Sequence, residues 1–324
     1  MKVAVDIGFG YTKAIAENGK SVVFPSMVSK RMTANSKMGF AYKENYIVTY
    51  MNNIYAIGEA ALNSPNSSAN FSEDRFTDEF SKILLLTALH ALDIEEQNIE
   101  LAIGLPIMLY SNYSDKVRDY IEFAEETIII NNEVRRYKID VCEVFPQGVG
   151  ALFSINDKIP NGYISVIDVG FRTTDVLLVK YNKGDIIPLT EFSFSVDEGT
   201  SRILTTLTKH IQHKYGIARN ETNILDVFET GVVLVKGREK DITEARDEIV
   251  REVTESIINK IVTKWNDFVN DVVRIYVAGG GAYMISPHLK VIGEMEIKIV
   301  DDPQFANAKG FLNMLESISV ENNT

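Results

Sequence analysis

An internal repeat constrains the fold of this chain more than any other feature of its sequence. Residues 5–13 read V-D-I-G-F-G-Y-T-K, and residues 167–175, 162 positions later, read I-D-V-G-F-R-T-T-D. Each copy follows one strand-like run and precedes another, so we predict two β-hairpins, each with a glycine-containing turn and an Asp at its tip. Because the offset is half of the 324 residues, the repeat predicts a duplicated fold.

The elements around each hairpin follow a similar order in the two halves. Apolar spacing predicts a set of strands and helices in the first half: strands 21–24, 99–103 and 137–144, and a helix from residue 76 to about 92. The second half gives strands 189–196, 272–278 and 296–300, and helices 199–215, 249–265 and 305–318, with a more polar segment before residue 241. We therefore predict an α/β fold with two domains, residues 1–160 and 161–324, and a small inserted subdomain at about 27–75.

Composition excludes several classes of protein. The chain carries 33 basic and 45 acidic side chains, a net charge of −12, with no long basic run, which argues against direct binding of nucleic acid. Its single cysteine, Cys142, cannot form an internal disulfide and is expected to be a small buried apolar residue. Residues 1–6 lack the apolar core of a signal peptide, and no apolar run is long enough to cross a bilayer. We expect a cytoplasmic protein with no membrane partner.

The hairpin turns have the chemistry of a phosphate site. The glycines Gly8 and Gly10 leave backbone N–H groups accessible, and Thr12 and Lys13 add a hydroxyl and a positive charge. Two carboxylates, Asp6 and Asp168, would repel a polyphosphate unless Mg²⁺, held partly through water, lay between them. A single D-x-G-x-G is more often only a turn, but its duplication favours a clasp around one metal–nucleotide.

A triple glycine, Gly279–Gly281, follows the strand 272–278 and precedes a helix. It would allow a flat ring to approach the backbone closely, and an ordinary turn between strand and helix is the competing interpretation. The G-x-G-x-x-G spacing of a dinucleotide site and the G-x-x-x-x-G-K-[ST] of a P-loop are both absent from the sequence.

Together, five segments resemble the motifs of the superfamily that contains actin, sugar kinases and the heat-shock chaperone ATPases. In chain order they are phosphate 1 at residues 6–13, connect 1 at 145–148, phosphate 2 at 168–175, adenosine at 277–282 and connect 2 at 303–311. The chain is most similar to prokaryotic actin-like proteins of the ParM plasmid-segregation type. The resemblance implies an actin-like fold, two ribonuclease H-like domains around a central nucleotide cleft, with helix 305–318 packing back on the first domain.

The resemblance also implies roles for individual residues. Asp6 and Asp168 would hold water-bound Mg²⁺, and Lys13 would contact the outer phosphates of ATP, or alternatively of GTP. Gln147 would orient the attacking water, with Asp175 and Asp168 completing the catalytic set. The residues implied in cofactor binding are Asp6, Gly8, Gly10, Tyr11, Thr12, Lys13, Gly170, Arg172, Thr173, Thr174, Gly279, Gly280 and Gly281.

Three residues leave the interpretation open. Gln147 follows Pro146, so it is also a candidate polar helix cap. Phe171 and Arg172 stand where many members of the superfamily have small residues, which would leave fewer free amides for a phosphate. We expect the Arg172 side chain to be solvated.

The sequence thus predicts an actin-like ATPase that forms filaments in a nucleotide-dependent way and moves DNA through an adaptor. A basic, DNA-binding adaptor would suit the acidic chain. The alternative is a small-molecule kinase of the same fold, which needs a carboxylate base, and Asp175 is the only candidate in the motifs. A chaperone ATPase is disfavoured because the chain ends soon after its last motif.

Overall fold

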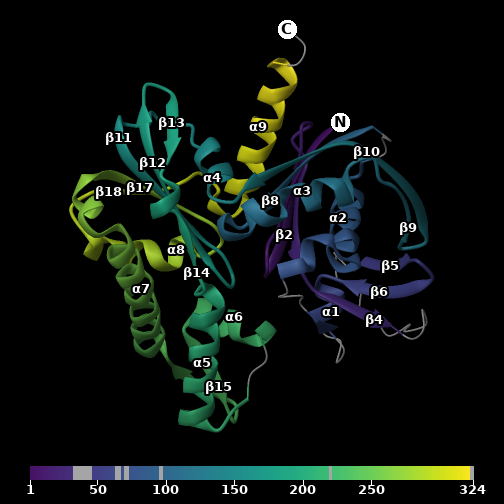
Figure 1. The fold of residues 1–324 in the computed structure, drawn as a ribbon. Coiled ribbons are helices and arrows are strands. Elements are labelled where there is room, and N and C mark those ends of the chain that lie inside the picture. The colour runs from purple at the N-terminus through teal and green to yellow at the C-terminus, as the bar shows by residue number, and fades with distance from the viewer. Residues whose placement is uncertain (32–45, 63–66, 69–72, 95–97, 219–220, 322–324) are drawn as a thin grey trace. The chain divides into compact units, whose positions relative to one another are not determined.

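The computed structural model describes residues 1–31, 46–62, 67–68, 73–94, 98–218 and 221–321. The chain divides into two units (Figure 1). Unit 1 contains residues 1–157 and 300–324, and unit 2 contains residues 158–299. The C-terminal residues therefore belong to unit 1. Each unit is described separately below.

Unit 1 is built on a sheet of ten strands in the order β3-β2-β1-β8-β10-β9-β5-β6-β4-β7. The strands are β1 (Lys2–Ile7), β2 (Tyr11–Ala16), β3 (Ser21–Pro25), β4 (Val28–Arg31), β5 (Tyr46–Tyr50), β6 (Asn53–Ile57), β7 (Ser67–Ser68), β8 (Ile99–Leu105), β9 (Glu125–Ile130) and β10 (Glu133–Pro146). Strand β10 joins the two halves of the sheet, because its first part pairs antiparallel with β9 and its second part pairs parallel with β8.

The helices of unit 1 are α1 (Glu59–Leu62), α2 (Glu79–Ala91), α3 (Ile107–Ile121), α4 (Val149–Phe153) and α9 (Ala306–Glu321). Helix α9 packs on β1, β8 and α4. Its Phe311 is fully buried and stacks on Phe145, with ring centroids 5.9 Å apart. At the crossing of α9 and α4, a Cβ atom on Gly310 would overlap the carbonyl oxygen of Gly150. The two backbones thus touch at a point where no side chain fits.

Unit 2 contains a six-stranded sheet and a separate hairpin. The strands are β11 (Gly162–Val169), β12 (Thr174–Asn182), β13 (Asp185–Pro188), β14 (Phe194–Val196), β15 (Val232–Val235), β16 (Arg238–Asp241), β17 (Val272–Ala278) and β18 (Glu296–Ile299). The order is β13-β12-β11-β17-β18, with β14 paired to β12, while β15 and β16 pair with each other. The helices are α5 (Thr200–Tyr215), α6 (Glu221–Thr230), α7 (Thr243–Trp265) and α8 (Ala282–Ile285). Trp265, at the end of α7, is fully buried in the core of this unit.

The predicted duplication is confirmed in the strand order. In unit 1 the segment β3-β2-β1-β8-β10 has two antiparallel pairs followed by two parallel pairs. In unit 2 the segment β13-β12-β11-β17-β18 has the same sequence of pairings. Both predicted hairpins are present, β1–β2 and β11–β12. The α/β class predicted from the sequence is therefore correct for both halves.

One predicted strand is wrong in part. Residues 189–196 were expected to be continuous, but Thr190–Phe192 forms a 3₁₀ turn and only Phe194–Val196 is a strand. The turn is held because the Ser193 hydroxyl donates to the Leu189 carbonyl at 2.9 Å and Trp265 Nε1 donates to the Phe192 carbonyl at 3.1 Å. These partners are side-chain groups whose pairing a β-like pattern does not reveal.

The range 27–75, expected to form an inserted subdomain, is described only in part. Its described strands β4, β5 and β6 continue the sheet of unit 1 through β9. Residues 32–45, 63–66 and 69–72 lie outside the described residues. A short 3₁₀ helix, Glu73–Thr77, leads from this range into α2. The sequence pattern did not predict α3, α6 or the β15–β16 hairpin.

Cys142 is buried in β10, as predicted, and this has a testable consequence. Burial raises the pKa of its thiol to about 12, so the reactive thiolate is scarce near neutral pH. We expect the folded protein at pH 8 to resist a thiol reagent such as dithionitrobenzoate, and the denatured chain to react with one equivalent. Because Cys142 is the only cysteine, the absorbance reports this site alone. Rapid, complete labelling of the folded protein would contradict the buried position.

Candidate functional site

The first loop, which connects β1 and β2, has a tightly closed turn. Strand pairing places Asp6 opposite Lys13, and the N–H of Gly8 donates to the carbonyl of Tyr11 at 3.0 Å. A Cβ atom on Gly8 would lie 2.8 Å from that carbonyl oxygen and 2.9 Å from Lys13 Nζ. Gly10 continues the turn, and its carbonyl accepts the N–H of Ser26 at 2.8 Å. Only glycine therefore fits at position 8 while Lys13 stays beside the turn.

Three of the predicted site residues meet at the base of this loop. Lys13 Nζ lies 2.9 Å from Asp6 Oδ2, and Gln147 Nε2 donates to Asp6 Oδ1 at 2.7 Å. The Asp6 side chain is almost fully buried. A buried carboxylate needs such compensation, because removal from water disfavours its charge. The pair Lys13 and Gln147 thus holds the carboxylate in one orientation.

The interpretation of Gln147 as a helix cap is not what the structure shows. Asn307, at the start of α9, caps α4 instead: its Oδ1 accepts the N–H groups of Gly148 at 2.9 Å and Ala151 at 3.1 Å. The main-chain N–H of Gln147 donates to Leu105 at 2.7 Å, which fixes its backbone beside β8. The side-chain amide is therefore directed to Asp6, and its Oε1 is not used in that hydrogen bond.

The Thr12 side chain differs from the expectation that its hydroxyl serves the phosphate site. It is fully buried, and its Oγ1 lies 2.9 Å from Ser26 Oγ, within hydrogen-bond distance. In the Asp6–Lys13 register Thr12 lies opposite Ile7, so its side chain points to the other face of the strand. Thr12 thus fastens the loop to the residues after β3.

Arg75 is a residue of this site that sequence reasoning missed. Its guanidinium is buried, donates to the carbonyl of Ile7 at 2.7 Å, and lies 3.9 Å from the ring centroid of Phe9 and 4.4 Å from that of Phe76. Arg75 thereby contacts the first loop at its start, Ile7, and at its tip, Phe9. No local pattern in the sequence indicates this role. Arg75 follows a polar stretch and lies 66 residues after Phe9, the ring that it contacts.

The second loop, which connects β11 and β12, repeats the geometry of the first. Asp168 lies opposite Asp175, and the N–H of Gly170 donates to the carbonyl of Thr173 at 2.9 Å, the same turn bond that Gly8 makes. Both carboxylates are buried. Asp175 accepts a short hydrogen bond from the Ser195 hydroxyl, and Thr174 Oγ1 donates to the Glu198 carbonyl at 2.8 Å.

Helix α5 begins against the second loop. The N–H groups of Thr200 and Ser201 donate to the carbonyls of Gly170 at 3.1 Å and Phe171 at 2.7 Å. A Cβ atom on Gly199 would lie 2.6 Å from the Gly170 oxygen. The first N–H groups of this helix, which would otherwise be an anion site, thus serve to hold the loop.

Arg172 lies at the exposed tip of the second loop. Its Nε donates to Asp197 Oδ1 at 3.2 Å, and both side chains are in contact with solvent. A solvated position was expected from the sequence, and the ion pair with Asp197 adds a partner that was not. Exposed pairs of this kind contribute little to stability.

The three glycines after β17 have different roles. Gly281 donates its N–H to the Val169 carbonyl at 3.0 Å, and a Cβ atom there would lie 2.6 Å from Thr200 Cγ2. Gly279 has φ +84°, and a Cβ atom on it would overlap Asp168 Oδ1. Gly280 is exposed, with open space where a Cβ would be. Packing on the end of β11 and the start of α5 therefore accounts for two of the glycines, and of the three only Gly280 has free space beside it.

Alanine substitutions should separate these roles. We expect Gly279→Ala to lower the free energy of unfolding by about 2 kcal/mol, because its φ is left-handed and the new methyl overlaps a buried carboxylate. Gly280→Ala should change it by less than about 0.5 kcal/mol. Urea unfolding of the two variants beside the wild type measures the difference. Equal losses from the two substitutions would contradict the described packing.

The residues of the first loop fit a Mg²⁺ held through water. Asp6 Oδ1 and Oδ2 each already accept one hydrogen bond, from Gln147 and Lys13, and a carboxylate oxygen can accept another from a metal-bound water. Among the described residues, no group of three or more His, Cys, Asp or Glu side chains is placed to hold a metal directly. Within the same residues no helix is both long and apolar enough to cross a bilayer.

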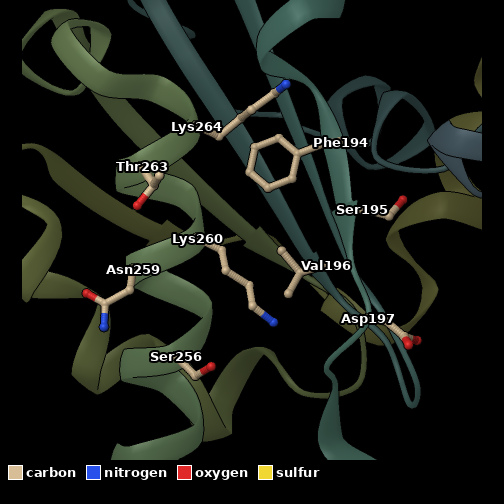
Figure 2. Close-up of a pocket in the computed structure, with 9 residues that line it drawn as sticks. All are labelled: Phe194, Ser195, Val196, Asp197, Ser256, Asn259, Lys260, Thr263 and Lys264. Atoms are coloured by element: carbon tan, nitrogen blue, oxygen red, sulfur yellow. The ribbon is translucent and has the colours of Figure 1, made fainter.

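A groove of about 700 Å³ lies in unit 2 between β14 and α7 (Figure 2), and it is lined in part by Ser195 and Asp197, the partners of Asp175 and Arg172. Its lining residues are Phe194, Ser195, Val196, Asp197, Ser256, Asn259, Lys260, Thr263 and Lys264. No residue predicted from the sequence to belong to the nucleotide site is among these lining residues. Lys260 is held there by Glu198, at 2.8 Å.

Comparison with known families matches both halves of the chain. A family model described as the N-terminal domain of actin-like proteins matches residues 4–150. A second, described as the C-terminal domain of the MreB-like archaeal actin homologue, matches residues 166–291. The chain belongs to the actin-like protein family. Both matches include the loop of their half, which agrees with the resemblance found in the sequence.

Whole-length relatives of this actin-like protein agree with that result. An archaeal actin homologue of Thermoplasma volcanium is 28% identical, over 97% of this chain and 98% of the relative. An archaeal actin homologue crystallised in complex with ADP is 25% identical with a TM-score of 0.84, covering 98% of this chain and 99% of the other. A 15-stranded ParM filament from Clostridium botulinum has 28% identity, TM-score 0.84 and the same coverage. The actin-like fold is thereby established.

Proposed function

We propose that this actin-like protein hydrolyses a nucleoside triphosphate in a Mg²⁺-dependent reaction, with ATP as the substrate and GTP as the alternative. The observation that carries the proposal is the contact of one buried carboxylate, Asp6, with both Lys13 and Gln147. These groups lie beside a turn in which position 8 must be glycine. A phosphate site needs a cation, accessible main chain and a residue able to orient water, and this arrangement supplies them.

Each residue has a distinct part in this proposal. Lys13 is shared between Asp6 and the outer phosphates when the nucleotide binds, and the lack of a side chain at Gly8 leaves room for its ammonium group. Gln147 orients the attacking water through its Oε1, which takes no part in the hydrogen bond to Asp6. Bound Mg²⁺ would neutralise charge on the phosphates, with Asp6 and Asp168 accepting hydrogen bonds from its waters.

The second loop supplies the remaining groups. Asp175 polarises the attacking water, and Gly280 offers the open backbone on which a purine could lie. That both loops serve one nucleotide rests on the repeat of the motif in the sequence. A relative of the same length, the archaeal actin homologue crystallised with ADP, supports nucleotide as the ligand.

Phosphate release from the purified full chain tests the enzymatic part of the proposal. We expect release from ATP, GTP or both in Mg²⁺ and none in excess EDTA, and we expect Lys13→Ala to raise KM because it removes the cation that meets the phosphates. Lys20→Ala is the matched control, since that exposed lysine pairs with Asp93 in a surface contact. Transfer of the phosphate to a small metabolite, rather than to water, would favour the kinase alternative.

We further propose that hydrolysis is coupled to assembly of this protein into filaments. The 15-stranded ParM filament, 28% identical over nearly the whole chain, supports self-association. A cytoplasmic role in segregating plasmid or other DNA through a basic adaptor follows from the ParM-type resemblance and from the net charge of −12.

Co-sedimentation tests the link to DNA. Assembled protein mixed with DNA alone should leave the DNA in the supernatant at 100 mM salt, because an acidic surface repels phosphates. Addition of a basic DNA-binding protein encoded beside this chain should carry the DNA into the pellet. DNA that pellets without any adaptor would contradict this part of the proposal.

A further inference from the structure

Asp175 lies within one row of residues across the sheet of unit 2. Strand pairing places Asp168 of β11 opposite Asp175 of β12, and Asp175 opposite Ser195 of β14. Residues directly opposite one another in a sheet project from the same face, with Cβ atoms about 5 Å apart. The row therefore brings two carboxylates and one hydroxyl together.

The Ser195 hydroxyl donates a short hydrogen bond to Asp175 Oδ1. Asp175 is only 3% exposed, so water can do little to orient its carboxylate. The terminal torsion of Asp has broad preferences, and a bond to one of its two oxygens restricts rotation about it. Because the acceptor is a carboxylate, such a bond is stronger than one between neutral groups.

Strand β14 is itself held from the opposite side. Figure 2 shows Phe194 and Val196 directed toward α7, while Ser195 projects from the other side of the strand. Val196 is 3% exposed and belongs to the core of unit 2. Packing of these neighbours thus fixes the position from which Ser195 reaches Asp175.

Glu198, just after β14, adds two further attachments. Its carboxylate accepts hydrogen bonds from Ser256 at 3.1 Å and Lys260 at 2.8 Å, both on α7. Its carbonyl accepts the Thr174 hydroxyl at 2.8 Å, one residue before Asp175. Glu198 therefore links α7 to the strand that carries Asp175, two residues beyond the end of β14.

We infer that Ser195 is a positioning residue for Asp175. The hydroxyl holds the carboxylate in the orientation in which it polarises the attacking water, and Ser195 itself does not touch the nucleotide. This inference rests on the proposed function, in which Asp175 acts on that water. Nucleotide binding does not depend on the contact, so the effect should fall on kcat rather than on KM.

Three variants of the full chain test this. Ser195→Ala should lower kcat about tenfold, with KM changed less than about twofold, and Ser195→Thr, which keeps the hydroxyl on a β-branched side chain, should restore kcat to within about threefold of the wild type. Ser193→Ala is the matched control. The Ser193 hydroxyl bonds only main-chain groups in the described structure, those of Leu178 and Leu189, so its loss should lower the melting temperature and leave kcat unchanged.

A double-mutant cycle with Asp175→Asn identifies the route of the effect. If Ser195 acts through Asp175, removal of its hydroxyl should change kcat less than twofold in the Asp175→Asn background. A tenfold loss in that background, an unchanged kcat in Ser195→Ala, or no rescue by Ser195→Thr would each overturn the inference while the proposed function stands. Absence of hydrolysis by the wild type would overturn the proposed function itself.

Discussion

Gln147→Ala is expected to lower kcat for nucleotide hydrolysis about a hundredfold while the dissociation constant of the nucleotide changes only a few-fold. The side-chain amide of Gln147 donates to Asp6, and its main-chain N–H donates to the Leu105 carbonyl of β8. Its loss removes the group proposed to orient water but leaves Asp6 paired with Lys13, so we expect the phosphate contacts to persist. Catalysis of phosphoryl transfer depends mostly on such positioning.

Phosphate release at saturating nucleotide gives kcat for this variant, and titration with a fluorescent nucleotide gives its affinity. The matched control is Gln212→Ala, on an exposed turn of α5, which should keep the wild-type values. A loss of affinity as large as the loss of kcat would show that Gln147 binds the nucleotide instead. An unchanged kcat would remove Gln147 from the mechanism.

Gly310→Ala is expected to destabilise unit 1 by about 3 kcal/mol or more. The new methyl would overlap the carbonyl oxygen of Gly150 and lie 2.9 Å from its Cα atom, so α9 and α4 would have to move apart. Separation of these helices would also shift Asn307, which caps α4, and Phe311, which packs on Phe145. The atoms that the new methyl would meet all belong to the backbone of α4, so no flexible side chain could move aside.

The sign of the change in the free energy of unfolding distinguishes a crowded Gly310 from an uncrowded one. Helix propensity alone favours alanine over glycine by about 1 kcal/mol, so an uncrowded Gly310 would give a more stable protein. Ser317→Ala, at an exposed position of the same helix, is the control and should be neutral or slightly stabilising. Urea unfolding followed by circular dichroism measures all three proteins. A stabilised Gly310→Ala would contradict the close crossing of α9 and α4.

The two hairpins and their repetition in both units could be predicted because their signals are local. Alternating apolar residues and a turn glycine recur at the same period, so the sequence alone placed Asp6 and Asp168 at equivalent ends of equivalent strands. Elements without a local pattern were not predicted. Every residue of β16 is exposed, and α3 buries only Val117 and Ile121, so neither has the periodicity that sequence reasoning needs.

The partners of the loops could not be predicted because they come from distant parts of the chain. Arg75, Asn307 and Ser195 reach the site through contacts that only the tertiary fold creates. The glycine triplet shows the same limit. A turn signal identified it, but only the packing against Asp168 and Val169 explains why Gly279 and Gly281 must be glycine.

Simultaneous recording of phosphate release and light scattering, followed by sedimentation of the same sample, tests the central claim most directly. With Mg²⁺ and ATP or GTP, the wild-type protein should scatter light and pellet above a critical concentration, and phosphate release should accompany assembly. The Gln147→Ala protein should assemble with nucleotide and release phosphate about a hundredfold more slowly. Hydrolysis by the wild type without assembly at any concentration, or no hydrolysis at all, would contradict the proposal that this protein couples nucleotide hydrolysis to filament assembly.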